Sequence, residues 1–175
     1  MAKVGFRLAF LAALLAFLLA PGPVAAERRT IGYLETVRIY PGELTLPAKI
    51  DSGAATSSID VSKIEEFDVG GKPWVRFRLA DGVGKGLVIE RPLVRLANIR
   101  RSGTQMQTRY VINLGICLDG FYKEAQVNLN DRSGMNYRML IGRRFLEDKF
   151  VIDTSAKHLT KPECPEAPKA EAPKR

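Results

Sequence analysis

The chain has 175 residues, of which 46 % are hydrophobic and 26 % are charged, and its formal net charge is +8. These values are typical of one globular domain with tails, and they exclude a fibrous or a wholly disordered protein. The positive charge favours anionic surroundings such as cell-wall polymers or phospholipid headgroups, which makes an association with the cell envelope plausible. No basic run with interleaved aromatic residues is present, so we expect no nucleic-acid partner.

The first 26 residues have the layout of a secretory signal peptide. Lys3 and Arg7 precede an uncharged apolar run over residues 8–20, and small residues follow up to Ala26. A membrane span needs about 20 apolar residues, so this run is short for a retained anchor. We therefore expect cleavage after Ala26 and a periplasmic or secreted protein.

The rest of the chain has mainly the pattern of short strands separated by turns. Apolar and charged residues alternate over 74–79, as in a half-buried strand. The glycine-rich stretch 81–86 predicts the tip of a hairpin that returns over 87–96, and Asp119-Gly120 predicts a second hairpin. Residues 57–66 fit either a short helix or an irregular connection. Further strands are predicted over 31–39, 44–50, 108–114, 113–118, 121–129, 139–141 and 150–153, and a helical turn or two over 144–149.

Short strands at regular spacing predict an all-β barrel or sandwich. We place one domain over residues 27–160. From residue 161 onward Pro, Ala, Lys and Glu dominate. A segment of this composition buries too little apolar surface to become ordered, so a disordered tail is predicted over residues 161–175.

Cysteine and histidine usage narrows the chemistry. Cys117 and Cys164 are the two cysteines, and an exported chain meets an oxidising compartment. They either form a disulfide or remain a buried Cys117 and a free Cys164, and the sequence does not choose. The single histidine, His158, follows the last predicted strand, which disfavours a Ser–His–Asp or Cys–His site. Zinc-ligand spacings and a phosphate-binding loop are absent from the sequence, so we expect no metal and no cofactor.

One short segment has the composition of a catalytic loop. An apolar strand over residues 44–50 delivers Asp51 at its end, and Ser52 places a hydroxyl beside the carboxylate. Gly53 and Ala54 leave room for another backbone or a substrate to come close. Asp-Ser-Gly is also ordinary turn chemistry, so this triplet alone does not predict catalysis.

A second segment far downstream makes the pattern more specific. An apolar strand ends in Ile141-Gly142-Arg143 before the predicted helical turn. This order resembles retropepsin-like aspartic peptidases, in which the second strand threads beside the Asp loop and an Arg-led helix packs under it. In this resemblance, the hairpin over 74–96 takes the place of the flap. About residues 31–159 are similar to one bacterial family, long filed as ATP-dependent zinc proteases, associated by name with glutamate ligases of the RimK type and now regarded as retropepsin-like. The segments that carry this similarity are residues 51–58, 100–103, 109–112 and 129–143.

The resemblance implies a closed acid-protease barrel with one short C-terminal helix, acting as an aspartic endopeptidase on a peptide or protein substrate. Asp51 would be the catalytic residue, with Ser52 and Gly53 holding its carboxylate. Two-lobed aspartic peptidases carry two Asp motifs per chain, whereas this chain carries one, so a homodimer is implied. Two carboxylates about 3 Å apart share one proton, so that one activates a water and the other donates to the scissile carbonyl.

The resemblance also assigns supporting residues. For substrate binding they are Ala54, Asp81, Gly82, Gly84 and Gly86, and for support of the Asp loop they are Ile141, Gly142 and Arg143. This chain departs from the pattern of viral retropepsins at Ala55. The viral enzymes carry an Asp at that position, and this Asp pairs with the Arg of Gly-Arg. Arg143 is therefore expected to find another acceptor, Asp131 or Asp153.

Substrate and activity stay open at this point. The association with glutamate ligases makes glutamate-rich peptides the first substrate candidates, although such ligases need cytoplasmic ATP and the chain is expected to be exported. Four arginines either select an acidic substrate or form a solvated strand face, namely Arg76, Arg78, Arg100 and Arg101. The alternative function is a non-catalytic periplasmic peptide-binding or envelope scaffold module that uses Asp51 as an anchor.

Overall fold

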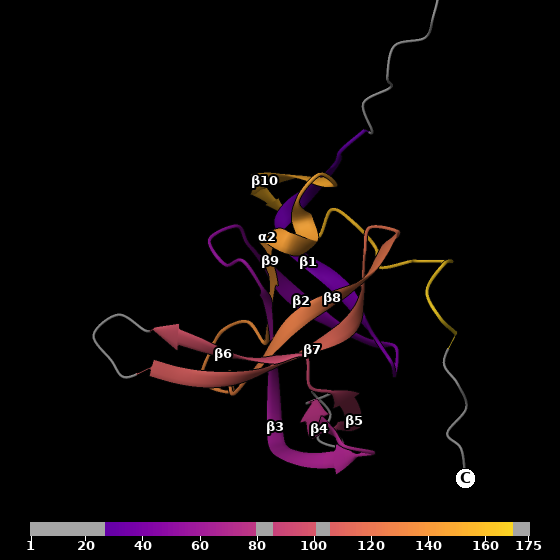
Figure 1. The fold of residues 1–175 in the computed structure, drawn as a ribbon. Coiled ribbons are helices and arrows are strands. Elements are labelled where there is room, and N and C mark those ends of the chain that lie inside the picture. Colours follow the sequence, from indigo (N-terminus) through magenta and orange to yellow (C-terminus); the bar gives the residue numbers. More distant parts are fainter. Residues whose placement is uncertain (1–26, 80–85, 101–105, 170–175) are drawn as a thin grey trace, which may run out of the picture.

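The computed structural model describes residues 27–79, 86–100 and 106–169. The expected signal segment, residues 1–26, lies outside these ranges. Within them the chain forms strands and one short helix, which confirms the all-β prediction (Figure 1). No helix in the described part is long and apolar enough to cross a membrane. In chain order the elements are β1 (Arg29–Tyr40), β2 (Leu44–Asp51), β3 (Ser57–Val69), β4 (Lys72–Leu79), β5 (Leu87–Pro92), β6 (Arg95–Arg100), β7 (Met106–Leu118), β8 (Phe121–Asn130), β9 (Met139–Gly142), α2 (Arg143–Leu146) and β10 (Phe150–Lys157).

Six of the strands close into a barrel. The hydrogen-bonded order β10-β1-β2-β9-β3-β8-β7-β6 is joined by a further pairing between β1 and β7, so the path from β1 to β7 returns to its start. At the closure Ile39 lies opposite Ile116. The short β9 runs parallel to β2 and antiparallel to β3, which inserts it between the two strands that flank Asp51. The closed acid-protease barrel implied by the resemblance is therefore confirmed.

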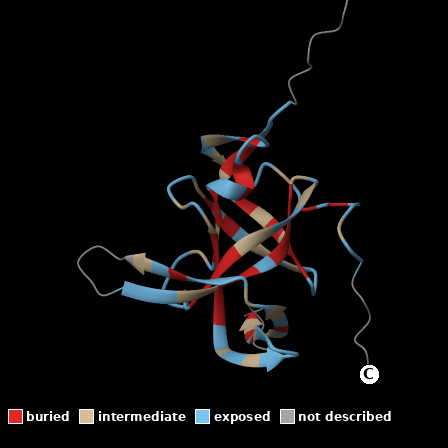
Figure 2. Cartoon of the chain, viewed as in Figure 1, coloured by how far each residue is buried: buried red, intermediate tan, exposed pale blue. Residues whose placement is uncertain are grey.

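Apolar side chains from every strand of the barrel form its core. Figure 2 shows the buried positions along these strands in red. The alternation over residues 74–79 is borne out, since Val75, Phe77 and Leu79 are buried. Burial at about 25 cal/mol per Å² of apolar surface is the main term that holds such a fold together. The core extends under α2 through Phe145 and Leu146.

The turn at Asp119-Gly120 is also as predicted. Both residues have positive φ, 49° and 69°, as a two-residue hairpin turn of type I′ requires. It joins β7 to β8, which pair in continuous register from Val111–Asn128 to Leu118–Phe121.

Residues 57–66 form neither a helix nor an irregular connection. They belong to β3, which pairs with β8 and β9 inside the barrel and then with β4. A register shift between Ser62 and Glu65, with Lys63 at φ 52°, divides the two halves of the strand. The first half of β3 is buried, and β3 pairs with neighbouring strands on both of its edges. These tertiary contacts make residues 57–66 a strand, because they outweigh the weak local propensity of the segment.

The predicted return strand over residues 87–96 is divided between two sheets. β5 pairs with β4, and together with the second half of β3 they form a small sheet at the bottom of Figure 1. β6 instead pairs with β7. The chain crosses from the small sheet to the barrel between β5 and β6. Leu93 N donates to Pro73 O on β4, whereas Val94 N donates to Val111 O on β7.

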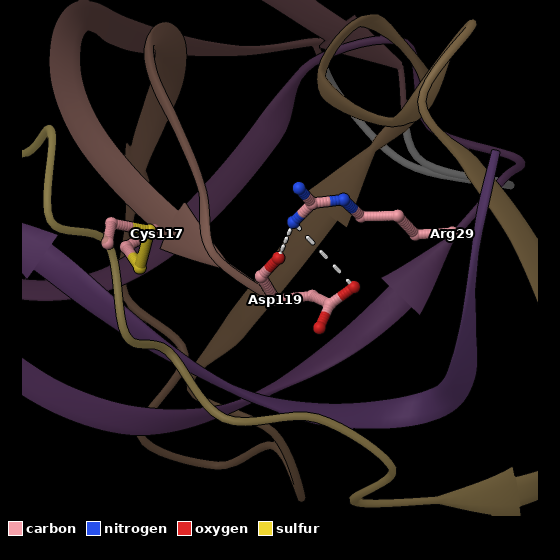
Figure 3. The surroundings of a disulfide bond; sticks show 4 residues. Arg29, Cys117 and Asp119 are labelled. Atoms are coloured by element: carbon pink, nitrogen blue, oxygen red, sulfur yellow. Dashed lines mark hydrogen bonds and ion pairs between the residues drawn. A yellow bond between two sulfur atoms is a disulfide. The ribbon is translucent and has the colours of Figure 1, made fainter. Parts of the chain in front are cut away.

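The chain after β10 is held against the barrel by a disulfide and by a buried carboxylate. Cys117 on β7 is bonded to Cys164, which answers the question the sequence left open. Near this bond, Arg29 donates to the backbone oxygen of Asp119 at the β7–β8 turn, and its guanidinium lies 3.9 Å from the Asp119 carboxylate (Figure 3). Residues 161–169 form no helix or strand, and the disulfide ties Cys164 in this segment to the barrel.

Glu35 is the buried carboxylate. It is fully inaccessible to solvent. Its side chain accepts hydrogen bonds from the amides of Gly32, Leu159 and Thr160 and from the Thr160 hydroxyl, at 2.7 to 3.2 Å. A buried charge is tolerated when its oxygens are satisfied in this way. Glu35 thus fixes the point at which the chain leaves β10.

Candidate active site

Asp51 is the last residue of β2, and its carboxylate is held by the loop that follows. Oδ1 accepts hydrogen bonds from the amides of Gly53, at 3.1 Å, and Ala54, at 3.2 Å. Within the described residues Oδ2 accepts none. Ser52 and Gly53 are exposed, and Asp51 is half-buried. The loop therefore orients one carboxylate oxygen by backbone donors and leaves the other open.

The second motif lies beside this loop, as the resemblance implied. Asp51 is the register partner of Gly142 in the parallel pair of β2 and β9. Gly142 N donates to the Ser57 hydroxyl at 3.1 Å, and Arg143 N donates to Ala54 O at 2.8 Å. Ile141 is fully buried in the core below. Two segments 90 residues apart thus form one unit around the carboxylate.

Gly142 permits this close approach. A Cβ at this position would lie 2.7 Å from the carbonyl carbon of Thr56 and 2.9 Å from the amide nitrogen of Ser57. Real Cβ atoms do not approach backbone this closely, so a glycine is required by the packing of β9 against the loop.

The expected acceptors of Arg143 are wrong. Its Nη1 donates to Ser52 O at 2.9 Å and to Gly53 O at 3.0 Å, both in the Asp loop itself. Asp131 and Asp153 instead accept from the amide and hydroxyl of the serine two residues later, Ser133 and Ser155. Those hydrogen bonds, the hydroxyl's above all, lower the pKa of each aspartate. Arg143 still packs under the loop, but it uses carbonyl oxygens where the viral pattern has a carboxylate.

A pocket of about 470 Å³ lies next to the loop. One wall is the segment Ala54, Ala55 and Thr56, and the opposite wall is the edge strand β6 from Arg95 to Ile99. None of the described residues that line the pocket is acidic. Four of them are arginines, namely Arg95, Arg109, Arg132 and Arg144. Ser58 and Asn128 also line it.

The hairpin residues predicted to bind substrate are not among the described residues that line this pocket. Asp81, Gly82 and Gly84 lie outside the described residues. Gly86 adjoins β5 and accepts a hydrogen bond from Arg78 at 3.4 Å, and it is not among the residues lining this pocket. Of the predicted substrate-binding residues, Ala54 lines the pocket. The lining residues from β6, Arg95 to Ile99, form no motif in the sequence that would mark them as part of a site.

The described residues contain no cluster of three or more His, Cys, Asp or Glu side chains that could hold a metal ion. The polar side chains of the Asp loop and the neighbouring pocket include the Asp51 carboxylate, the Ser52 hydroxyl and the four guanidinium groups.

Comparisons with known proteins agree with this geometry. The model of the RimB-like family, described as retropepsin-like aspartic endopeptidase RimB, matches residues 30–163. The chain is 37 % identical over 117 residues to a probable alpha-L-glutamate ligase of Shewanella halifaxensis, and 33 % identical to one of Desulfotalea psychrophila. These matches cover 65 % and 63 % of this chain, and the chain spans about a quarter of the length of either relative. A crystal structure of a Legionella pneumophila protein of unknown function is 28 % identical, with a TM-score of 0.67 over 77 % of this chain and all of the other.

Proposed function

Because the chain belongs to the RimB-like family of retropepsin-like aspartic endopeptidases, we propose that it hydrolyses peptide bonds with Asp51 as its catalytic residue. The observation that carries this proposal is the arrangement of the Asp51 carboxylate. Two backbone amides fix Oδ1, while Oδ2 has no hydrogen-bond partner among the described residues. A carboxylate oriented in this way can accept a proton from a bound water.

A single carboxylate does not complete the reaction, so the proposal includes a homodimer with two-fold symmetry. Each protomer contributes one Asp51. The ionised carboxylate removes a proton from the water, and the protonated one donates to the carbonyl oxygen of the scissile bond. Exposed Ser52 and Gly53 lie at the tip of the loop, where the partner's loop would meet them. The pair titrates as a unit, which places activity at acidic to mildly acidic pH.

We propose peptides rich in glutamate as the substrates. The relatives that the chain matches are named probable alpha-L-glutamate ligases, and the product of such a ligase contains glutamyl amide bonds that a peptidase could hydrolyse. The excess of guanidinium groups in the pocket beside the Asp loop favours an anionic peptide. Export by a cleaved signal segment would place the reaction in the periplasm or outside the cell.

The test is cleavage of a glutamate-rich peptide library between about pH 4 and 7. Asp51→Asn keeps an oxygen that can accept from the Gly53 and Ala54 amides, so it should fold and lose turnover. Asp68→Asn is the matched control, because Asp68 Oδ1 also accepts a backbone amide in a turn, that of Gly71, at 2.8 Å. Turnover by the control but not by Asp51→Asn supports the proposal. A folded protein that sediments only as a monomer at high concentration and cleaves nothing would favour the non-catalytic binding module instead.

A further inference from the structure

Among the described residues, the pocket beside the Asp loop is lined by positively charged side chains and by no negatively charged ones. Arg95 and Arg144 form no ion pair within the described residues, and Arg95 Nε donates to the neutral side chain of Gln126 at 3.1 Å. No described lining residue supplies a negative charge. Guanidinium groups gathered in a concave site raise the local concentration of anions and present planar pairs of donors that match carboxylates.

Two polar atoms at the floor of the pocket have no hydrogen-bond partner among the described residues. They are the Ser58 hydroxyl and Asn128 Oδ1. Both residues are buried, Ser58 being 5 % exposed and Asn128 6 % exposed. The two residues are register partners in the parallel pair of β3 and β8, so they lie side by side at the bottom of the site. Unsatisfied buried polar groups are uncommon in folded proteins, and one explanation is a ligand that completes them.

The pocket is continuous with the catalytic loop. Ala54 lines it, and the amide of the same residue donates to Asp51 Oδ1 at 3.2 Å. Arg144 is placed by the same loop, because its amide donates to Ala55 O at 3.2 Å. A side chain seated between Arg144 and Ser58 therefore belongs to a residue close to the peptide bond that the water activated by Asp51 would attack.

We propose that Ser58, Asn128 and Arg144 form a specificity pocket that binds a carboxylate side chain of the substrate next to the scissile bond. Arg144 pairs with the carboxylate at the rim. The Ser58 hydroxyl donates to the carboxylate at the floor, and Asn128 Oδ1, which is an acceptor, takes a hydrogen bond from a backbone amide of the substrate. This inference rests on the proposed function and assigns the residues that choose the substrate.

Binding can be measured without turnover. In the Asp51→Asn background, fluorescence anisotropy would follow a labelled peptide of α-linked glutamates and a matched glutamine peptide at one fixed ionic strength. We expect the glutamate peptide to bind at least about tenfold more tightly than the glutamine peptide, as one charge-assisted contact provides.

Two substitutions should remove this preference. Arg144→Met keeps the apolar stem and loses the charge, and Asn128→Asp places a negative charge at the floor. Each should reduce the glutamate-to-glutamine affinity ratio about fivefold or more. Lys72→Met, which removes an exposed positive charge outside the pocket, should change it less than about twofold. With Asp51 intact, Arg144→Met should lower kcat/KM for the glutamate peptide about fivefold or more relative to that for the glutamine peptide.

Equal affinity for the two peptides overturns the inference, as does a preference that survives Arg144→Met. Arg144 is exposed, so this variant remains informative if Asn128→Asp does not fold, which circular dichroism would reveal. Absence of turnover in the unmodified protein together with a charge-dependent binding ratio would refute the proposed function and leave the pocket assignment standing.

Discussion

Replacing Gly142 by alanine tests whether the contact between β9 and the Asp loop defines the site. The added methyl group would lie 2.7 Å from Thr56 C, 2.9 Å from Ser57 N and 3.0 Å from Ala54 O. All three atoms are backbone, and the loop is fixed from the same side by the hydrogen bond from Arg143 N to Ala54 O. No flexible side chain can move away, so the backbone itself must shift. Overpacking of this kind costs about 1–3 kcal/mol of unfolding free energy, and we expect the upper half of that range.

Urea denaturation followed by circular dichroism would measure this cost. With a slope of about 1–3 kcal/mol per molar urea, the midpoint should fall by roughly 1 M. Gly134→Ala is the matched control, because a Cβ there has no heavy atom within 4 Å, and its effect should be within about 0.5 kcal/mol. Peptide turnover should fall in Gly142→Ala even where the protein is fully folded, because the displaced segment carries the amide of Ala54. A Gly142→Ala midpoint equal to that of the control would refute the packing argument.

Two further predictions concern stability. Replacing both Cys117 and Cys164 by serine should lower the unfolding free energy by about 2–4 kcal/mol, because the disulfide joins residues 47 positions apart in the sequence. Limited proteolysis of this variant should cut the chain after β10. A urea midpoint equal to that of the unmodified protein would contradict the prediction. Hydrogen bonds from the hydroxyl and amide of Ser155 lower the pKa of Asp153. The charged carboxylate therefore stabilises the fold, and this contribution is complete above the ordinary pKa of an aspartate, about 3.9. The contribution is lost as the pH falls through the lowered pKa of Asp153 in the folded protein. Asp153→Asn should therefore make the urea midpoint less sensitive to pH below about pH 4, and identical pH profiles for the two proteins would argue against the effect.

The sequence predicted those parts of the fold whose signals are local. The alternation over residues 74–79 and the turn at Asp119-Gly120 depend on a few neighbouring residues, and both are confirmed. The strand β3 was not predicted, because its conformation depends on pairing with β8, β9 and β4, which lie elsewhere in the chain. The strands β8 and β9 are distant in the sequence, and pairing with distant strands leaves little trace in a segment's own residues.

The residues of the candidate site also fall into those that the sequence predicted and those that it did not. The Asp loop and the strand ending at Gly142 were found because each has a recognisable order of residues. Ser58 and Asn128 were not, since 70 positions separate them and only the parallel register of β3 and β8 brings them together. The crossing from β5 to β6 was also missed. It depends on Leu93 and Val94 donating to two different strands, which no local pattern reports.

The replacement of an acid by Ala55 connects the two halves of the site. In the viral pattern, the Asp at this position satisfies the Arg of Gly-Arg. Here Arg143 is satisfied by the carbonyl oxygens of Ser52 and Gly53, so the loop keeps its anchor without that carboxylate. Ala55 lines the arginine-rich pocket. A carboxylate at this wall would neutralise part of the pocket's positive potential and would repel an anionic side chain. Because carbonyl oxygens satisfy Arg143, the loop keeps this support while its Ala55 wall adds no negative charge to the arginine-lined pocket.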